Sequence, residues 1–340
     1  MIRRLVPPAA RTFRALSALL GLLVLLSGCG GGPKVAAPTG RILYVATANG
    51  IYGFSIMSTG TLSPLSSQPL VTTSGLEQIA ATPGIPTGQS TPLLLGATGS
   101  ASLSAWTIGG SGTLTPATSL SLSCSVVSPI TGVTVTSDSQ YVLVVDGTSN
   151  SPSNLGLISF SKTGTCSPGS ASIYPLQPAI DCAVSGTSPC VLFLTGSSTS
   201  SSVSPTTPNE IPVTLSSGAF GTVATPYTCA SGACPFGATF DPTTVFFYAS
   251  LTGTAPPSLQ SIAQGAKSST ASVGFPAAAP VNYPCVDTLG GVVYTPTANG
   301  FLYASSTDSS GGLGAPNAVL TPSSLPVSLD MTSCAVVASP

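Results

Sequence analysis

Asp241 and Asp287 hold the positions in this sequence that are best suited to chemistry. Each follows a short strand-like run, FGATF or PCV, and each precedes a turn-forming segment. Acids at equivalent places in a repeated fold can line one pocket at a central channel, where carboxylates activate water or hold a cation. Asp138 and Asp330 have comparable turn-rich surroundings. The alternative is structural, because an Asp that begins a tight turn accepts hydrogen bonds from its own backbone, as FDPTT and SDSQ indicate.

The remaining catalytic chemistry is narrow, because the chain of 340 residues contains no histidine. Ser-His and Cys-His nucleophile pairs, His-based metal sites and His acid/base steps are therefore excluded. The sequence assigns no catalytic residue and predicts no cofactor and no metal. An enzyme that develops negative charge on its substrate would also need a positive group nearby, and residues 41–340 offer only Arg41, Lys162 and Lys267.

The N-terminus has the composition of a secretion signal. Its basic residues are Arg3, Arg4, Arg11 and Arg14, and the apolar run ALSALLGLLVLLSG follows. This run is too short for a permanent membrane-spanning helix. The stretch LSGC at 26–29 resembles the lipobox of bacterial lipoproteins, which implies a signal peptide at 1–28 and membrane attachment through a lipidated Cys29. The alternative is an ordinary cleaved signal with a chance cysteine. Residues 29–40 are expected to form a flexible tether.

The charge of the mature chain excludes one class of partner. Four of the eight Lys and Arg lie in the predicted signal peptide, so four basic residues remain against nine acidic ones, a formal charge of −5. Binding to nucleic acid needs a basic surface, and none is predicted here. Although charged residues are scarce, 42% of the chain is hydrophobic and these residues form short runs, which favours packed strands over disorder.

A repeat with a period close to fifty residues runs through the rest of the chain. Its apolar landmarks are ILYVA from Ile42, PLLLGA from Pro92, YVLVV from Tyr141, CVLFL from Cys190, VFFYA from Val245 and VVYTP from Val292. Other strand-like segments and turns rich in Gly, Pro, Asn and Ser flank each run, and no helical periodicity follows residue 40. Four-stranded repeats of this length are typical of propeller blades. We therefore predict an all-β fold, a β-propeller over 41–340.

The two ends of the chain are expected to meet. The first repeat lacks an inner strand, and SCAVV from Ser333 resembles the inner strands of complete repeats. We therefore predict that the C-terminal strand joins the N-terminal blade and closes the ring, which removes exposed sheet edges. This gives six blades. Seven is the alternative, if the irregular stretch between Leu65 and Thr91 holds further strands.

The tetrapeptide TANG occurs in both the first and the last repeat, at 47–50 and 297–300. Asn-Gly is a favoured two-residue hairpin turn because both residues accept a positive φ. We therefore interpret TANG as the same hairpin in two blades. In addition, Trp106 is interpreted as a packing residue of a strand, the alternative being a platform for a sugar.

The first repeat, YVATANGIYGFSI followed by STGTLSP, resembles the repeat of the lactonase-type propellers, the group of 6-phosphogluconolactonase and the YVTN-repeat proteins. The resemblance is clear in the first unit, fair in the second and third, and faint later. It implies a propeller, although members of the family are typically seven-bladed. The family includes enzymes that open lactone rings and many secreted or lipid-anchored proteins.

Eight cysteines remain besides Cys29, an even number that suggests disulfides in an exported protein. Two pairs have a local rationale, since Cys182 and Cys190 flank a turn between strands and Cys229 and Cys234 bound a short loop. By elimination, Cys285 pairs with Cys334 and Cys124 with Cys166. The distance between neighbouring inner strands argues against these last two pairs if it exceeds about 7 Å. A zinc site is the competing interpretation, without CxxC spacing or histidine to support it.

These observations predict a binding or scaffold module, lipid-anchored in the bacterial cell envelope at the outer membrane or cell surface. Its partner would be an envelope protein, a peptide or a neutral glycan, and its domain would lie in an oxidising extracytoplasmic compartment. One alternative is a lactonase-type hydrolase that uses acids near the central channel. A second alternative is a structural surface protein without a discrete site.

Overall fold

The structure is a computed structural model, and it describes most of the chain after residue 36. The described residues are 37–66, 68–118, 120–124, 127–146, 154–160, 166–170, 179–181, 190–194, 209–214, 219–220, 225–226, 235–241, 243, 245–251, 256–264, 266, 268–276, 280–324 and 330–338. From Pro38 onward they belong to one compact unit. The predicted signal peptide and Cys29 lie outside the described residues. In the described part, no helix has the length and apolar character needed to span a membrane.

The strands pair into antiparallel sheets, which are four-stranded along their main path. The first sheet contains β26 (Met331–Ala338), β1 (Pro38–Thr47), β2 (Gly50–Met57) and β3 (Leu62–Pro64), with β4 (Val71–Thr72) also paired to β2. The second contains β5 (Gln78–Ala81), β6 (Leu93–Ala97), β7 (Ser104–Ile108) and β8 (Leu114–Pro116). The third contains β9 (Gly132–Val135), β10 (Tyr141–Val145), β11 (Asn154–Ser159) and β12 (Cys166–Ser170).

Three further sheets follow in the chain. The fourth contains β13 (Ala179–Asp181), β14 (Cys190–Leu194), β15 (Asn209–Thr214) and β16 (Ala219–Phe220), with β17 (Thr225–Pro226) also paired to β15. The fifth contains β18 (Pro235–Asp241), β19 (Phe246–Leu251), β20 (Ser258–Ala263) and β21 (Ala271–Gly274). The sixth contains β22 (Cys285–Asp287), β23 (Val292–Pro296), β24 (Leu302–Ser306) and β25 (Asn317–Leu320), and the 3-10 helix η1 (Pro322–Ser324) comes after it.

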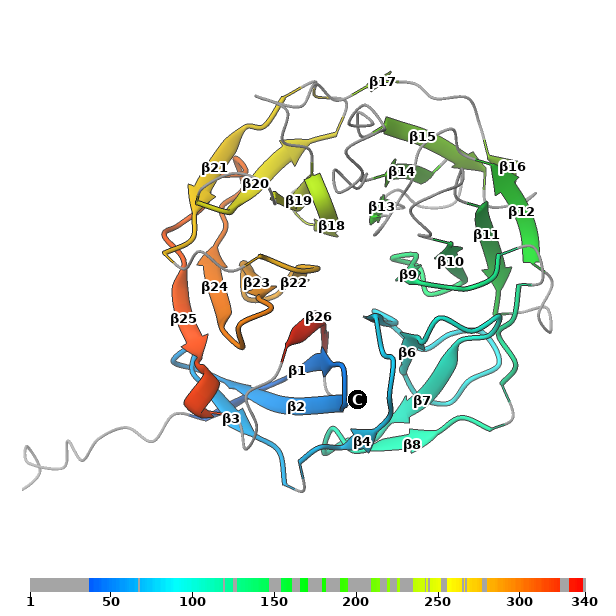
Figure 1. Ribbon diagram of the computed structural model, residues 1–340, viewed down its shortest axis with the longest axis horizontal. Helices are drawn as coiled ribbons and strands as arrows, with labels where there is room; N and C mark the ends of the chain where they lie inside the picture. Colours follow the sequence, from blue (N-terminus) through cyan, green and yellow to red (C-terminus); the bar gives the residue numbers. More distant parts are fainter. Residues whose placement is uncertain are drawn as a thin grey trace, which may run out of the picture. The chain divides into compact units, whose positions relative to one another are not determined.

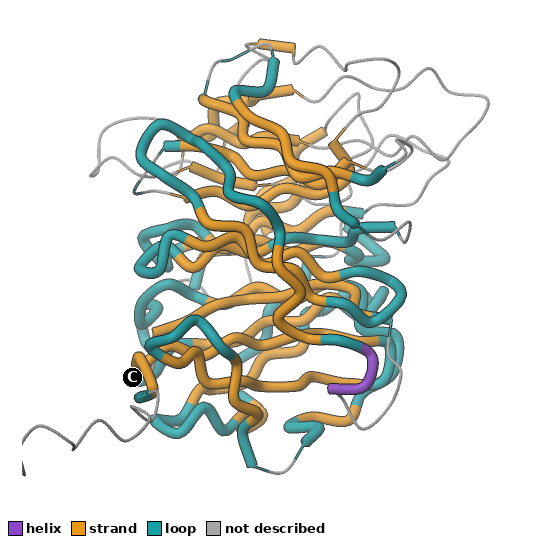
Figure 2. The backbone as a smooth tube through the Cα atoms, turned by 90° about the vertical axis from the view of Figure 1, so that its left-hand side faces the viewer, coloured by secondary structure: helices purple, strands orange, loops and turns teal. Residues whose placement is uncertain are grey.

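The sheets are arranged around an axis, with one strand of each sheet innermost (Figure 1). These inner strands neighbour one another in the order β26, β5, β9, β13, β18 and β22, and β22 neighbours β26. Figure 2 shows the strands crossing the unit, with loops gathered along its two sides. The arrangement is an all-β propeller with four-stranded blades, as the repeat predicted. The alternative prediction of a seventh blade between Leu65 and Thr91 is wrong. The described strands of that stretch are β4, which joins the first sheet, and β5, which belongs to the second.

The first sheet combines the two ends of the domain. Strand β26 pairs antiparallel with β1, so that Val45 faces Cys334 and Leu43 faces Val336. The predicted joining of the C-terminal strand to the N-terminal blade is confirmed by this pairing. Strand β1 thereby has a hydrogen-bonded neighbour on each side, β26 and β2.

The continuous apolar runs arise because both faces of a blade are covered by its neighbours. Alternate residues of β1 point in opposite directions, and residues 42–47 are buried whichever way they point. Leu43 packs in a cluster with Tyr294 of the last sheet. Tyr44 packs in a cluster with Leu94 and Trp106 of the second sheet. Trp106 is only 6% exposed, which confirms that it is a packing residue.

The TANG hairpins are present, but their turns are one residue earlier than predicted. Thr47 pairs with Gly50, so the turn residues of the first copy are Ala48 and Asn49. In the second copy Gly300 has a φ of 82°. Among the described residues other than glycine, positive φ values occur at Ser139 and Val245, so Asn299 does not have one. The glycine follows the turn in this hairpin, where its missing side chain permits the left-handed conformation.

Candidate functional site

A cavity of about 360 Å³ lies where the inner strands end. The C-terminal residues of five inner strands form its wall, including Ala81, Val135, Phe240, Asp287 and Ala338. These strands therefore all run toward the cavity, as equivalent strands of a propeller do. The described residues thus place a pocket at one end of the central channel.

The wall is mainly aliphatic and uncharged. Its polar side chains include the hydroxyls of Thr134, Ser137, Thr239 and Thr288. Its charged side chains are Arg41 and Asp287. Arg41 is also the only Lys or Arg within the described residues, since Lys162 and Lys267 lie outside them.

Arg41 and Asp287 form an ion pair at the cavity wall. Nη1 of Arg41 donates to Oδ2 of Asp287, and the side chains are 16% and 2% exposed. Nε of Arg41 donates to Oγ1 of Thr39 at 3.1 Å. The backbone N–H of Gly290 donates to Oδ1 of Asp287 at 3.1 Å. Asp287 thus holds the turn that follows its own strand and compensates the cation beside it.

The ion pair also influences a neighbouring phenol. Burial raises the pKa of Tyr294 to about 12, and the negative charge of Asp287 adds to this rise while Arg41 opposes it. Tyr294 faces Cys285 across the β22–β23 pair. Its hydroxyl therefore stays protonated throughout the physiological range.

Asp241 is placed differently from Asp287, although both end an inner strand. Asp241 is fully buried, and its Oδ1 accepts hydrogen bonds from N and Oγ1 of Thr243 at 2.8 and 2.6 Å. The described cavity wall includes Phe240 but not Asp241. Asp241 therefore has the turn-holding role of the structural alternative. Its Oδ2 has no hydrogen-bond partner among the described residues.

The other two acids lie outside the described cavity wall. Oδ1 of Asp138 accepts from Oγ1 of Thr136 at 2.5 Å and from N of Gln140 at 3.0 Å, which is again a turn-holding contact. Asp330 is exposed just before β26. Within the described residues, no group of three or more His, Cys, Asp or Glu side chains could hold a metal ion.

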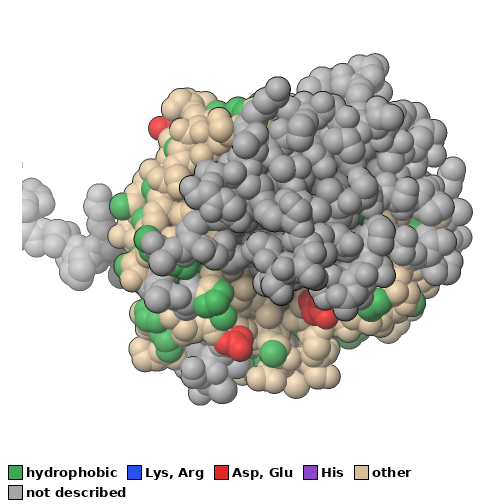
Figure 3. Space-filling view, turned by 45° about the horizontal axis from the view of Figure 1, so that its top comes forward, with side chains coloured by type: hydrophobic (Ala, Val, Ile, Leu, Met, Phe, Trp, Pro, Cys, Tyr) green, Lys and Arg blue, Asp and Glu red, His purple; other side chains and the backbone are tan. Residues whose placement is uncertain are grey.

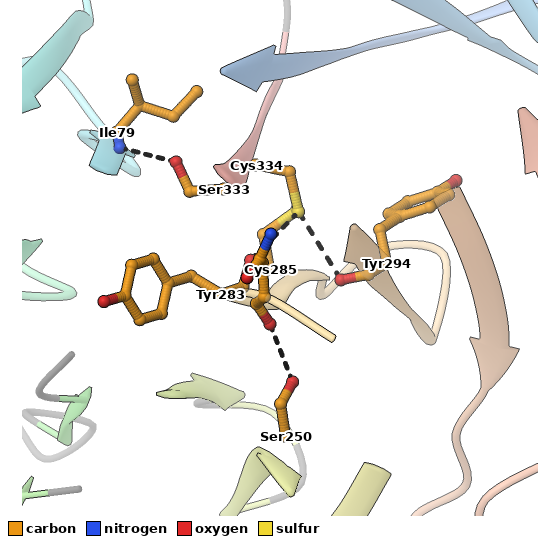
Figure 4. The surroundings of a disulfide bond; sticks show 8 residues. Ile79, Ser250, Tyr283, Cys285, Tyr294, Ser333 and Cys334 are labelled. Atoms are coloured by element: carbon orange, nitrogen blue, oxygen red, sulfur yellow. Dashed lines mark hydrogen bonds between the residues drawn. A yellow bond between two sulfur atoms is a disulfide. The ribbon is translucent and has the colours of Figure 1, made fainter. Parts of the chain in front are cut away.

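A disulfide forms part of the cavity wall and joins two sheets. Cys285 of β22 and Cys334 of β26 are bonded, with Cα atoms 5.4 Å apart (Figure 4). Neighbouring inner strands are therefore close enough for a bridge, which removes the objection raised at the sequence level. Ser333 lies beside this disulfide, and its Oγ accepts a hydrogen bond from N of Ile79 in β5.

The second disulfide predicted by elimination is also present. Cys124 and Cys166 are bonded, with Cα atoms 5.1 Å apart. The two pairs with a local rationale cannot be placed, because Cys182, Cys229, Cys234 and the side chain of Cys190 lie outside the described residues. The two observed disulfides fit an extracytoplasmic location.

Tyr283 lies just before the cavity-lining segment of the last sheet. Figure 4 shows its ring pointing away from the Cys285–Cys334 disulfide. Burial raises the pKa of Tyr283, and the negative charge of Glu77 contributes to the rise. This phenol is therefore neutral at physiological pH.

The structure separates residues that the sequence analysis treated alike. In the sequence Asp241 and Asp287 occupy equivalent positions, whereas only Asp287 is part of the described cavity wall. The sequence presented Arg41 as one of three cations without indicating that a partner 246 residues away would hold it at the site. Leu289, an exposed residue of the wall, was not singled out at all.

Comparison with known proteins gives a likeness of fold. The chain is similar to the periplasmic gluconolactonase PpgL of Pseudomonas aeruginosa, with a TM-score of 0.53 and 12% identity over 81% of each chain. It is also similar to a putative 6-phosphogluconolactonase of Bacteroides uniformis, with a TM-score of 0.52 and 14% identity over 83% of this chain and 82% of the other.

A third similar structure comes from a nidogen/laminin complex, with a TM-score of 0.54 and 10% identity over 87% of this chain and 97% of the other. No protein-family model and no curated protein matches the sequence. At these identities the solved structures support the propeller fold, including that of lactonase-type proteins.

Proposed function

We propose that this protein is a binding module whose ligand occupies the cavity at the end of the channel. The observation that carries the proposal is the cavity itself, about 360 Å³ in volume and walled by the ends of five inner strands. Pockets of this size, mainly apolar with a few polar groups, are typical of ligand sites. The inner strands make the wall rigid, because each is paired within its own sheet.

The charges of the wall favour an uncharged ligand. Arg41 and Asp287 compensate each other, so a charged ligand would lose its hydration without gaining a free counter-charge. Of the guanidinium nitrogens, Nε and Nη1 make the hydrogen bonds assigned among the described residues. Nη2 can therefore donate to a carbonyl or hydroxyl oxygen. A peptide or a neutral glycan has such oxygens.

We also propose that the six sheets form six blades of one closed ring. The order of the inner strands supports this proposal, because each neighbours the next and β22 neighbours β26. The β26–β1 pairing and the Cys285–Cys334 bridge both lie at the junction of the first and last sheets. A closed ring would fix the width of the cavity.

The proposed location rests on the N-terminal sequence. We propose that residues 1–28 are removed, that Cys29 is lipidated, and that 29–40 tether the propeller to the bacterial cell envelope. The two disulfides support an oxidising compartment. Mass spectrometry of the mature protein tests this proposal, since a diacylglyceryl group on an N-terminal Cys29 is expected, and an unmodified N-terminus would contradict it.

Site-specific photo-crosslinking in the producing cells tests the binding function. A photoreactive residue at Thr288 lies at the cavity, whereas one at Ala101 lies in the loop after β6, at the opposite end of the channel. Discrete, reproducible adducts from position 288 and none from position 101 are expected. Equal adducts from both positions, or none from position 288, would argue for a structural protein without a discrete site.

A lactonase-type hydrolase is the second candidate, and the position of Arg41 favours it. This cation lies in the cavity wall, where it could neutralise the oxyanion of an opening lactone. The folds of PpgL and of the Bacteroides uniformis protein, whose names state a lactonase activity, support the same candidate. Against it stands Asp287, whose carboxylate is already bound by Arg41 and Gly290.

A panel of lactones that includes glucono-δ-lactone separates the two candidates. If channel acids catalyse the reaction, the protein should turn over a lactone, and Asp241→Ala or Asp287→Ala should abolish this turnover. Asp287→Asn is the matched variant, because it removes the charge and keeps the shape of the side chain. No turnover, or turnover indifferent to these changes, would leave the binding function as the better account.

A further inference from the structure

The exposed aliphatic residues of the described chain gather on one face. The large hydrophobic side chains that are exposed there are Ile85, Val245 and Leu289, at 55%, 43% and 74%. Each lies in a loop that follows an inner strand, namely β5, β18 or β22. Because these strands all end at the cavity, the three loops lie at the same end of the channel, and Leu289 is itself part of the cavity wall. We call these three residues the aliphatic rim.

The loop that carries Ile85 is held in place by its neighbour. The N–H of Gly84 donates to Oγ of Ser139 at 2.8 Å. Oγ1 of Thr87 donates to Oε1 of Gln140 at 2.6 Å. Both acceptors belong to the loop that follows β9. Ile85 therefore stands between two anchored residues, and its exposure is a fixed feature of the loop.

The two other rim residues are held by the acids that end their strands. Asp241 binds Thr243 through its side chain, and its carbonyl accepts from N of Val245 at 2.9 Å. Val245 has a φ of 62°, which is unfavourable for a β-branched residue. Asp287 binds N of Gly290, directly after Leu289. The two buried acids thus serve as positioning residues for the rim.

We infer that the aliphatic rim and the cavity together dock an uncharged, apolar segment of another polypeptide. This inference rests on the proposed binding function and selects a peptide over a glycan. Glycan sites use aromatic platforms, whereas the rim is aliphatic and Trp106 is buried. Ile, Val and Leu instead bury favourably against other aliphatic side chains, and the cavity of about 360 Å³ has a mainly aliphatic wall to receive them.

The charges define the partner further. The charged side chains of the cavity wall are Arg41 and Asp287. Figure 3, which does not look onto the cavity end, shows mostly uncharged groups on the described surface, with a few acidic side chains. Arg41, the only basic residue of the described part, is paired with Asp287. An acidic segment would find no free cation there, and an anionic membrane would find no basic patch. A neutral segment suits a cavity wall whose two charges compensate each other.

A displayed library of random twelve-residue peptides, selected on the whole mature protein, provides the test. We expect enrichment of uncharged sequences with at least two aliphatic or aromatic residues. Synthetic copies of the selected peptides should bind Leu289→Ser and Ile85→Ser at least about tenfold more weakly, which corresponds to about 1.4 kcal/mol for each lost contact. Ala101→Ser, an exposed change on the opposite face, should alter the affinity less than about twofold.

Other results would overturn the inference. Enrichment of charged peptides, no enrichment, or equal binding to the rim variants would exclude the rim as a peptide site. Rim-dependent binding to neutral phosphatidylcholine vesicles would assign the face to a lipid surface. Rim-dependent dimerisation in analytical ultracentrifugation would assign it to a second copy of this chain.

The cavity and the rim can fail separately. If crosslinks form from Thr288 while Leu289→Ser and Ile85→Ser leave them unchanged, the binding function stands and the aliphatic rim is excluded. Circular dichroism and thermal unfolding of each variant show whether it is folded. The rim side chains are exposed, so Leu289→Ser and Ile85→Ser should unfold close to the wild-type temperature.

Discussion

Arg41 of β1 and Asp287 of β22 form a mostly buried ion pair that connects the first sheet to the last, across 246 residues of sequence. The same carboxylate holds the turn that carries Leu289. One interaction therefore stabilises the junction of the chain ends, sets the polarity of the cavity and positions its rim.

Removing one partner of this pair should destabilise the fold strongly. Arg41→Met leaves the Asp287 carboxylate buried without its counter-charge, and a loss of about 3–5 kcal/mol in unfolding free energy is expected. The double variant Arg41→Met/Asp287→Leu removes both charges and should recover most of this loss. Urea unfolding curves measure both values, and a single variant as stable as wild type would contradict the importance of the pair.

The Cys285–Cys334 bridge should raise the free energy of unfolding by the amount that the chain-entropy model gives for a loop of its length. The cysteines are 49 positions apart, and loop closure of this length is worth about 4 kcal/mol in the chain-entropy model. The double variant Cys285→Ala/Cys334→Ala should therefore lose about that amount. Cys124→Ala/Cys166→Ala, with a separation of 42, is the matched comparison and should lose nearly the same.

Peptide mapping should recover both bridges from protein that is purified without a reducing agent. Lys and Arg are too rare for useful tryptic cleavage, so pepsin at acidic pH is the suitable protease, and acid also prevents disulfide exchange. Linked peptides are expected for Cys124 with Cys166 and for Cys285 with Cys334. If all four cysteines react with iodoacetamide in the unreduced native protein, both bridges are wrong.

Stability should fall at alkaline pH because of Tyr294. Its pKa is about 12 in the folded protein, above the value near 10 of an unfolded tyrosine. The unfolded state therefore loses its proton first, and the stabilisation is complete below pH 10 and decreases as the pH rises from 10 toward 12. Urea unfolding of wild type and Tyr294→Phe at pH 9, 10 and 11 should show a shallower decline in the variant. Equal slopes would indicate that Tyr294 ionises normally.

Much of the fold was predictable because local pattern and fold agree. The apolar runs near Ile42, Pro92, Tyr141 and Val292 all became blade strands, since each is covered on both faces. The similarity of Ser333–Val337 to other inner strands likewise identified the partner of β1. Repetition made these inferences possible, because each unit provided a template for the next.

The prediction failed where a single residue or a long-range contact decides the outcome. Asp241 and Asp287 look alike in sequence, and the sequence pattern does not reveal that Arg41, 246 residues from Asp287, binds one of them. The Asn-Gly turns moved by one residue because the Thr47–Gly50 pairing leaves Ala48 and Asn49 in the turn.

Filling the cavity is the most direct test of its role in binding. Thr134 is a partly exposed residue of the cavity wall. Thr134→Phe adds an aromatic ring at this position, whereas Thr134→Val keeps the volume and removes only the hydroxyl. The measurement is the yield of photo-crosslinked adducts from position 288 in the two variants. The account predicts that Thr134→Phe abolishes the adducts and Thr134→Val retains them. Full adduct yield in a folded Thr134→Phe protein would contradict the claim that the cavity binds the ligand.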